Sequence, residues 1–439
     1  RKNKPRLNTS MLFVTFIIIG YTSYAAIVIR SMSNPPLNEN NPSNVFSLIS
    51  FLNREQYGDR PLVYGQYYNA PYKRDRSGNA VQDETGSIYI KGEKKYEKVG
   101  IKTRTKYDSD FCTIFPRMYG SENKHINAYK AWTGIKGERK PTFTENLKFF
   151  FRYQVGFMYN RYFLWNFAGR QNDIQGHGVD ENGNRDFING NWISGIPIFD
   201  SRLGNQENLP PDLANNAANN KFYMLPLLLG LIGVFYHFKF AKKDAWVVFL
   251  LFFLTGLAII IYLNQTPYQP RERDYAYAGS TYAFAIWIGL GVAGLVKALE
   301  KKIPLLIPAI VVTILSSVLV PGIMAKEGWD DHDRSYKTAA RDFAINYLMS
   351  CEPNAIIITN GDNDTFPLWY AQEVENIRTD VRVLNFTLSS GDWYIHQLMR
   401  KLYKSEKLPF TLKESQYTTG TNDFIPYYET RRGAPRFRE

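Results

Sequence analysis

Residues 264–280 read NQTPYQPRERDYAYAGS and lie between two long apolar runs. Proline fixes φ and removes an amide donor, so Pro267 and Pro270 predict an irregular loop here rather than a helix. A membrane chain usually places a plain turn between two spans, whereas this stretch concentrates four charges and three tyrosines. The residues of interest in this loop are Tyr268, Arg271, Glu272, Arg273, Asp274 and Tyr275.

Local chemistry leaves two interpretations of this loop open. In the first, the loop is a solvated turn whose arginines pair with the neighbouring acids, and such exposed pairs contribute only about 0 to 1 kcal/mol. In the second, Arg271 and Arg273 form a clamp for an anionic lipid headgroup, because a guanidinium binds phosphate with paired hydrogen bonds that lysine does not reproduce. The residues that would line the headgroup pocket or fix the guanidiniums are Tyr268, Tyr275, Glu272 and Asp274.

Five apolar runs of 16 to 21 residues with almost no charge are spread along the chain. Each is close to the roughly 20 residues that a helix needs to cross the hydrocarbon. The sequence therefore predicts a polytopic α-helical membrane protein with about five spans. The runs are residues 11–29, 222–238, 245–263, 281–296 and 303–323.

Basic residues cluster before the first span and in the second and fourth connections, which all fall on one side of the membrane. Lys and Arg are retained on the cytoplasmic side. The large polar segments and the Arg271 loop are therefore expected on the outer face, where arginine runs against the general charge bias. The basic residues are Arg1, Lys2, Lys4, Arg6, Lys239, Lys242, Lys243, Lys297, Lys301 and Lys302.

These assignments divide the chain into four parts. The first is a basic cytoplasmic start with the first span, and the second is a large extracytoplasmic loop domain with interfacial helices. The third is a four-span unit that carries the Arg271 loop, and the fourth is an extracytoplasmic α/β domain. Their ranges are 1–30, 31–221, 222–325 and 326–439.

Three segments of the second part have patterns that predict their structure. Residues 45–53 have apolar side chains at helical spacing and predict an interfacial helix, and residues 87–91 alternate between turn signals and predict a hairpin. Residues 147–167 are rich in aromatic side chains and contain Arg152 and Arg161. This segment either lies at the membrane interface with its arginines reaching lipid phosphates, or forms a core helix of the outer domain.

The fourth part alternates strands with helices, which predicts a parallel α/β unit. Asp362 and Asp364 follow its first strand, at the edge where open α/β sheets bind ligands, so they are secondary site candidates. Asp364 is better explained as a cap of the next helix. The predicted helices are 335–349, 366–376 and 392–403, and the predicted strands are 355–359 and 381–386.

Several other classes of site receive no support from the sequence. The net charge of +12 is spread over both faces, so a nucleic-acid partner is not expected. The Asp-rich segment 180–186 lacks the glycine and glutamate positions of a calcium loop and predicts a solvated turn. No metal site is expected from the histidines either, and two thiols far apart in sequence do not establish a bridge. These residues are His125, His177, His332, Cys112 and Cys351.

Three long strings carry a resemblance to a known family. They are TPYQPRERDYAYAGS at 266–280, NAIIITNGDNDTFPLWYAQEV at 354–374 and DVRVLNFTLSSGDWYIHQL at 380–398. The chain resembles bacterial membrane proteins related to protein O-mannosyltransferases, which have the C-type glycosyltransferase fold and are similar to glycosyltransferase family 117. The resemblance covers most of the second half of the chain.

The resemblance implies transfer of a sugar, such as mannose, from a polyprenyl-phosphate donor to a protein or glycan acceptor on the periplasmic side of the bacterial inner membrane. It implies no cofactor other than this lipid-linked donor. In this fold the catalytic carboxylate lies in the outer loop after the first helix of the full enzyme, a region expected upstream of Arg1. The catalytic residue is therefore assigned to no position here, and the chain is expected to be the carboxyl portion of the enzyme.

A non-catalytic envelope assembly protein is the alternative. Its large outer domains would bind a protein partner, and its spans would only anchor it in the inner membrane. A transporter is disfavoured, because coupled transport usually needs a charged residue inside a span and the interiors of the five runs contain no acidic or basic one.

Overall fold

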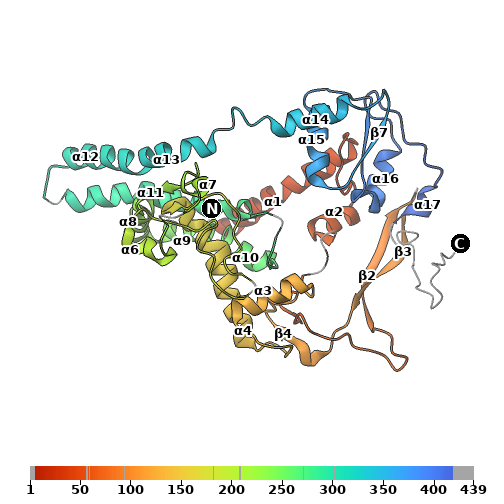
Figure 1. The fold of residues 1–439 in the computed structure, drawn as a ribbon, viewed down its shortest axis with the longest axis horizontal. Coiled ribbons are helices and arrows are strands. Elements are labelled where there is room, and N and C mark those ends of the chain that lie inside the picture. The colour runs from red at the N-terminus through yellow and green to blue at the C-terminus, as the bar shows by residue number, and fades with distance from the viewer. Residues whose placement is uncertain are drawn as a thin grey trace. The chain divides into compact units, whose positions relative to one another are not determined.

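The computed structural model describes residues 5–55, 58, 60–92, 94–180, 182–206, 209–269, 271–300 and 302–418 (Figure 1). The predictions made for Pro270, for segment 419–439 and for Arg1, Lys2, Lys4 and Lys301 lie outside these residues. The chain forms two compact units. The α/β unit comprises Arg1–Asp59, Gln82–Thr105 and Ser335–Glu439, and the helical unit comprises Arg60–Val81 and Lys106–Arg334. This division follows contacts within the fold and not the side of the membrane.

The described residues of the helical unit form helices of several kinds and two short antiparallel strand pairs. The strand pairs are β1 (Tyr64–Gln66) with β4 (Cys112–Ile114), and β5 (Gly169–Arg170) with β6 (Asn220–Lys221). The helices are η2 (Ser109–Phe111), α3 (Asn123–Thr133), α4 (Phe143–Phe149), η3 (Phe150–Asn160), α5 (Arg161–Phe167), α6 (Pro197–Asp200), η4 (Ser201–Leu203), α7 (Pro211–Ala214), α8 (Leu225–Phe240), α9 (Lys242–Leu254), α10 (Leu257–Leu263), η5 (Asp274–Tyr277), α11 (Ala278–Leu299), α12 (Leu306–Ser317), η6 (Val318–Gly322) and α13 (Ile323–His332).

Within the described part of the chain, four helical stretches are long and apolar enough to cross a membrane. They are Pro5–Met32, Lys242–Leu263, Asp274–Leu299 and Leu306–His332. The remaining predicted span, residues 222–238, corresponds to α8 (Leu225–Phe240), which has 16 residues. A helix of this size is about 24 Å long, short of the roughly 30 Å of hydrocarbon. The structure therefore supports four of the five predicted spans by length and composition.

Helices α8 and α11 pack closely because glycines face each other between them. A Cβ atom added to Gly233 would lie 1.8 Å from the Trp287 carbonyl oxygen, and one added to Gly291 would lie 2.1 Å from the Leu229 carbonyl oxygen. Small residues allow backbones to approach in this way when helices associate in lipid. The buried Trp287 also donates from Nε1 to His237 Nδ1 across the same interface, at 3.3 Å.

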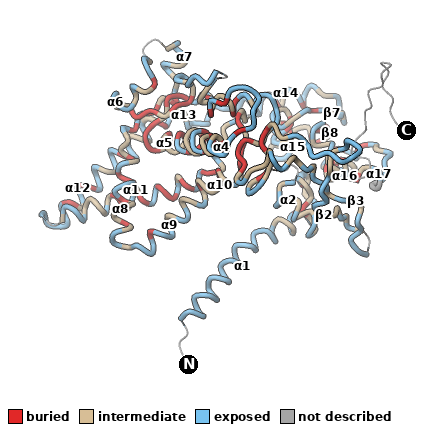
Figure 2. Tube along the Cα trace, turned by 90° about the horizontal axis from the view of Figure 1, so that it is seen from below, coloured by how far each residue is buried: buried red, intermediate tan, exposed pale blue. Residues whose placement is uncertain are grey.

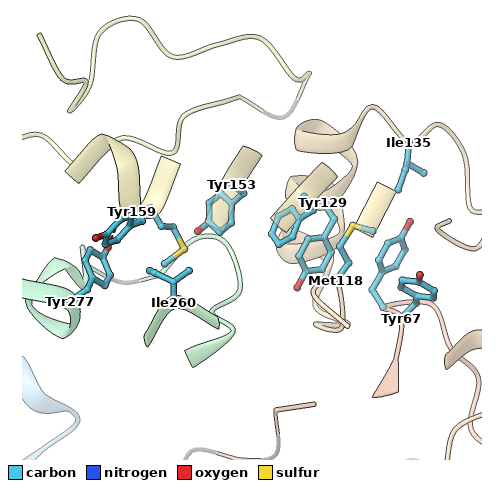
Figure 3. Close-up of a cluster of buried hydrophobic side chains, with 11 residues drawn as sticks. Tyr67, Met118, Tyr129, Ile135, Tyr153, Tyr159, Ile260 and Tyr277 are labelled. Atoms are coloured by element: carbon cyan, nitrogen blue, oxygen red, sulfur yellow. Dashed lines mark hydrogen bonds between the residues drawn. The ribbon is translucent and has the colours of Figure 1, made fainter. Parts of the chain in front are cut away.

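The aromatic segment predicted at 147–167 forms a continuous helical rod of α4, the π-helix η3 and α5. Its rings belong to a buried cluster with residues from α3, α10 and η5 (Figure 3). Arg152 is exposed on this rod, but Arg161 is only 5% exposed. The expectation that Arg161 reaches lipid phosphates is therefore wrong, because its guanidinium is enclosed in protein, and the core-helix interpretation fits this rod better. The cluster comprises Tyr67, Tyr68, Met118, Tyr129, Ile135, Phe149, Tyr153, Met158, Tyr159, Ile260 and Tyr277.

The α/β unit confirms the predicted alternation of strands and helices. Strands β7 (Ile356–Thr359) and β8 (Arg382–Asn385) pair in parallel, with Ile356 opposite Arg382. A buried apolar cluster joins this pair to the helix before β7 and the helix between the two strands, with Leu348, Leu368 and Val383 among its members. The helices of this region are α14 (Ala339–Met349), α15 (Asp362–Glu373), η7 (Leu388–Ser390), α16 (Asp392–Leu398) and α17 (Glu414–Tyr417).

The amino-terminal part of this unit also follows the sequence prediction. Helix α1 (Pro5–Met32) is exposed along almost its whole length (Figure 2), as a lipid-facing span would be. The predicted hairpin is present and longer than expected, with β2 (Gln82–Lys91) antiparallel to β3 (Tyr96–Thr105). The helix predicted at 45–53 is α2 (Val45–Leu52), and its Phe46 ring stacks on Tyr89 of the hairpin at 4.7 Å.

Candidate functional site

The Arg271 loop begins at a fully buried asparagine. Asn264 ends α10 with a left-handed backbone, at φ 41°. Its Nδ2 donates to the carbonyl oxygens of Pro61 and Pro116 at 2.8 and 2.9 Å, and its Oδ1 accepts from Gln154 Nε2 at 3.1 Å. A buried amide with all these partners is expensive to displace. Asn264 therefore fixes the start of the loop against three other segments of the helical unit.

The loop borders a pocket with about 450 Å³ of empty space, part of it open to solvent. Four of the predicted site residues line it, namely Tyr268, Arg271, Glu272 and Arg273. The other walls come from α3, from η3 and from the segment between β5 and α6. The lining residues outside the predicted set are Ala128, Trp132, Tyr153, Phe157, Met158, Gln175, Gly176, His177, Gln265, Pro267, Gln269 and Tyr277.

Glu272 binds a buried arginine that the sequence did not connect with the loop. Both carboxylate oxygens of Glu272 accept from Arg161 Nη2 at 2.9 Å. Arg161 also donates from Nη1 to the Gly190 carbonyl oxygen at 2.8 Å and from Nε to the Phe157 carbonyl oxygen at 3.0 Å. Its guanidinium lies 4.0 Å from the ring centroid of Phe157 and 4.4 Å from that of Trp165. These contacts anchor the loop to the aromatic rod.

Arg273 is oriented by an amide. Its Nε donates to Gln269 Oε1 at 3.1 Å, and its Nη1 lies 3.5 Å from the Tyr275 hydroxyl. Gln269 is itself fixed, because its Nε2 donates to the Thr266 carbonyl oxygen at 2.9 Å and its carbonyl oxygen accepts from Gln175 Nε2 at 2.9 Å. A neutral partner orients the guanidinium without cancelling its charge.

Tyr275 and Asp274 do not line the pocket. Tyr275 is exposed, and Asp274 begins the short helix η5 that leads into α11. Asp274 acts on Tyr162 of α5: burial first, and then the negative charge of Asp274, raises the pKa of Tyr162 to about 12. This tyrosine therefore remains protonated at neutral pH and can donate a hydrogen bond.

Sequence reasoning missed His177 as a pocket residue. The His177 ring meets the Tyr268 ring edge to face, with centroids 4.7 Å apart. The two residues are ninety-one positions apart, and nothing in the local sequence around His177 marks it. Gln175 was missed for the same reason, because no sequence pattern distinguishes an amide side chain in a polar loop as a site residue.

The secondary candidates Asp362 and Asp364 belong to the α/β unit. Asp364 has a structural role at the start of α15. Asp364 Oδ1 accepts from the Gly361 amide at 2.8 Å and its Oδ2 accepts from the Asn360 amide at 2.7 Å. These bonds satisfy amides at the start of α15, as the capping prediction expected, although Asp364 acts from the third helical position rather than as the N-cap residue. The pKa of Asp364 is lowered, first by the bond from Asn360 and then by that from Gly361.

The remaining candidates stay outside the site. Asp180 forms an exposed turn in which its Oδ1 accepts from the amides of Asn182 and Asn184, as predicted for a solvated turn. Within the described ranges, no group of three or more His, Cys, Asp or Glu side chains could bind a metal ion. Cys112 and Cys351 are both free thiols.

Two protein-family models match parts of the chain. Residues 340–436 are similar to TMEM260-associated domain 2, and this match includes the strands and helices of the α/β unit from α14 onward. Residues 58–151 are similar to a family of unknown function (DUF8416). No curated protein and no solved structure matches the chain.

Proposed function

We propose that the protein is a membrane glycosyltransferase that moves a sugar, such as mannose, from a polyprenyl-phosphate donor to a protein or envelope acceptor. The observation that carries this proposal is the charge of the Arg271 pocket. Arg271 and Arg273 line it, and its lining carboxylate, Glu272, is bound by Arg161. A positive pocket with planar guanidiniums suits a phosphate group.

The membrane setting supports a lipid-linked donor. The loop joins α10 to η5 and α11, and these belong to two of the stretches that are long and apolar enough to cross a membrane. A phosphate carried by a polyprenyl chain lies at headgroup depth, where a loop between two spans would meet it. The distribution of basic residues favours the non-cytoplasmic side of the membrane for this loop, which in a bacterial inner membrane is the periplasmic side.

The reaction is a displacement at the anomeric carbon of the sugar. The acceptor hydroxyl oxygen forms a bond to this carbon, and the bond from the carbon to the phosphate oxygen breaks. The electron pair leaves with the polyprenyl phosphate, whose developing negative charge Arg271 and Arg273 would stabilise. The hydroxyl proton passes to a carboxylate base. We assign this base to no residue of the pocket, because Glu272 is engaged by Arg161.

The test is sugar transfer from radiolabelled polyprenyl-phosphate mannose by the protein in liposomes, measured per folded protein for Arg271→Ala and Arg273→Ala. Loss of a charge-assisted phosphate contact costs roughly 1.5 to 3 kcal/mol, or about ten- to a hundredfold in donor affinity or rate. The Arg271→Lys/Arg273→Lys pair should recover only part of this loss, because lysine lacks the planar fork. Arg152→Ala, an exposed arginine of η3, is the matched control. Unchanged donor dependence in the Arg271 and Arg273 variants would remove the clamp from the mechanism.

A partner-binding role for the α/β unit is the second candidate. In the described chain β7 pairs only with β8, and Ile356 and Ile358 of β7 are exposed. Parallel sheets are usually covered on both faces, so this exposed face favours contact with another protein. If membranes from cells lacking the protein transferred sugar normally, while Ile358→Lys abolished its function in cells, this second candidate would replace the first.

A further inference from the structure

The α/β unit contains its own pocket, apart from the residues discussed so far. It has about 460 Å³ of empty space, part of it open to solvent. Its walls come from α15, β8, α16 and the turn at 402–405, together with Pro36 and Leu37 from the segment that follows α1. Among its lining side chains are a cation, Arg382, and an anion, Glu373.

Arg382 is buried without a carboxylate partner. It is 4% exposed, and its Nη2 donates to the carbonyl oxygens of Gln397, Leu398 and Arg400 at the end of α16, at 3.0 to 3.1 Å. Among the described residues its Nε and Nη1 have no hydrogen-bond partner. Leaving buried donors unsatisfied is costly, and an acceptor delivered through the pocket would satisfy them.

A second guanidinium reinforces the positive charge. Arg400 donates to the carbonyl oxygens of Asn34 and Pro35, and its buried Nε has no partner in the described part of the chain. Neither Arg382 nor Arg400 forms an ion pair with a described acid. Burial lowers the pKa of each, and the charge of Arg400 lowers that of Arg382 further. Two like charges desolvated near each other favour binding of an anion.

The negative charge of the pocket, on Glu373, lies in a different environment. Glu373 is exposed and accepts a hydrogen bond from the Tyr403 hydroxyl, an interaction that raises the pKa of Tyr403 to about 12. Trp369 and Tyr394 also line the pocket. A carboxylate among aromatic rings suits an ammonium group, which is attracted both by the charge and by the ring faces.

The position of the pocket relative to α1 restricts the source of such a ligand. Pro36 follows the last residue of α1, Met32, by four residues, so this wall begins at most about 14 Å along the chain from the helix end. The connecting segment is fastened to the unit, because the Asn38 amide donates to Gln397 Oε1 at 2.9 Å and Asn38 Nδ2 donates to the Ser31 carbonyl oxygen at 3.1 Å. With α1 as a membrane span, the pocket lies at the depth of lipid headgroups.

We infer that this pocket binds the headgroup of a zwitterionic phospholipid, with its phosphate on Arg382 and its ammonium on Glu373. A bound headgroup would fasten the α/β unit to the membrane surface at the end of α1. The inference is independent of sugar transfer, because it concerns other residues and a bulk lipid rather than the donor.

The test measures binding to the full chain in detergent micelles with three probes: dihexanoyl phosphatidylethanolamine, dihexanoyl phosphatidylglycerol and inorganic phosphate. We expect the ethanolamine lipid to bind most tightly and phosphate most weakly. Arg382→Gln should weaken both lipids about tenfold or more, and Glu373→Gln should weaken only the ethanolamine lipid. Lys401→Ala removes an exposed cation of the same region that lies outside the pocket, and should change none of the three affinities.

Arg382 also caps α16, so its loss can disturb folding. Leu37→Trp fills the pocket from the connecting segment and leaves the bonds of Arg382 intact, and it should abolish lipid binding with an unchanged unfolding temperature. Lipid affinities unaffected by both Arg382→Gln and Leu37→Trp would overturn the inference. Equal affinity for inorganic phosphate and the ethanolamine lipid would also overturn it, because the site would then be one for free anions.

Discussion

Arg161 and Glu272 form an ion pair across 111 positions of sequence, with Arg161 almost completely buried and Glu272 on the rim of the Arg271 pocket. Arginine presents donors in several directions, so a single side chain can bind Glu272, the Gly190 carbonyl and the Phe157 carbonyl at once. The pair thereby connects the aromatic rod to the loop that carries the proposed phosphate contacts.

Substitution of Arg161 should therefore lower the free energy of unfolding and disturb the Arg271 pocket at the same time. Arg161→Ala leaves Glu272 and a buried carbonyl oxygen without their donor, and breaking a buried pair costs about 3 kcal/mol or more. Glu272→Gln, which keeps an acceptor, should cost less. The free energy of unfolding in detergent provides the measurement, with Arg152→Ala on the same rod as the exposed control. Equal effects of the two arginine substitutions would contradict a special role for the buried pair.

Gln269 is expected to act by positioning Arg273. Gln269→Ala removes the acceptor for Arg273 Nε but leaves every charge in place. The KM for the lipid-linked donor should rise about threefold to tenfold, less than in Arg273→Ala, because the guanidinium loses the acceptor that orients it but keeps its charge. The rate at saturating donor should change little. If the KM of the Gln269→Ala/Arg273→Ala double variant equals that of Arg273→Ala, Gln269 acts through Arg273. If the two increases in KM multiply, Gln269 contacts the donor itself.

Asp364 makes the stability of the α/β unit fall as the pH becomes acidic. Its folded-state pKa is lowered by the Asn360 and Gly361 amides, so the stabilisation is fully present above its unfolded pKa, about 3.9. It is lost as the pH falls through the lowered folded-state pKa. Asp364→Asn should lower stability by about 1 kcal/mol at pH 7 and less at pH 3. Thermal unfolding at both pH values measures this, and an equal loss at both would exclude the carboxylate as the cause.

The contact between α8 and α11 can be tested with two glycines of α11. Gly291→Ala places a Cβ 2.1 Å from the Leu229 carbonyl oxygen and must separate the helices, whereas Gly289→Ala meets nothing within 4 Å. We expect Gly291→Ala to lower the unfolding temperature and the yield of folded protein. Gly289→Ala should be neutral or stabilising by up to about 1 kcal/mol, because alanine has the higher helix propensity. A destabilised Gly289→Ala variant would show that this face of α11 is also packed.

The proposed topology places Lys242 in the cytoplasm and Asp83, Arg271 and Asp362 outside. Single cysteines at these positions, in a background without Cys112 and Cys351, can be treated with an impermeant thiol reagent in cells with a permeabilised outer membrane. Labelling of the last three positions alone is expected. Labelling of position 242 without position 362 would reverse the orientation.

The sequence alone was sufficient for the parts of the fold that depend on local pattern. Apolar runs predicted the long helices, and the alternation between 355 and 403 predicted the parallel pairing of β7 with β8 and the helices around it. The hairpin at β2 and β3 and the capping role of Asp364 were also predicted, because turn residues and short-range hydrogen bonds act within a few positions of one another.

Only the tertiary structure decided which distant residues meet. The partnership of Arg161 with Glu272 and of His177 with Tyr268 depends on how a helical rod and two loops pack, and no local spacing encodes it. Local sequence also could not place Arg161. Its neighbours would be aromatic both at the membrane interface and in a protein core, so a contact with lipid phosphates was one of the two expectations. A charged side chain is buried only where other segments satisfy its hydrogen bonds, and those segments are fixed by packing of the whole chain.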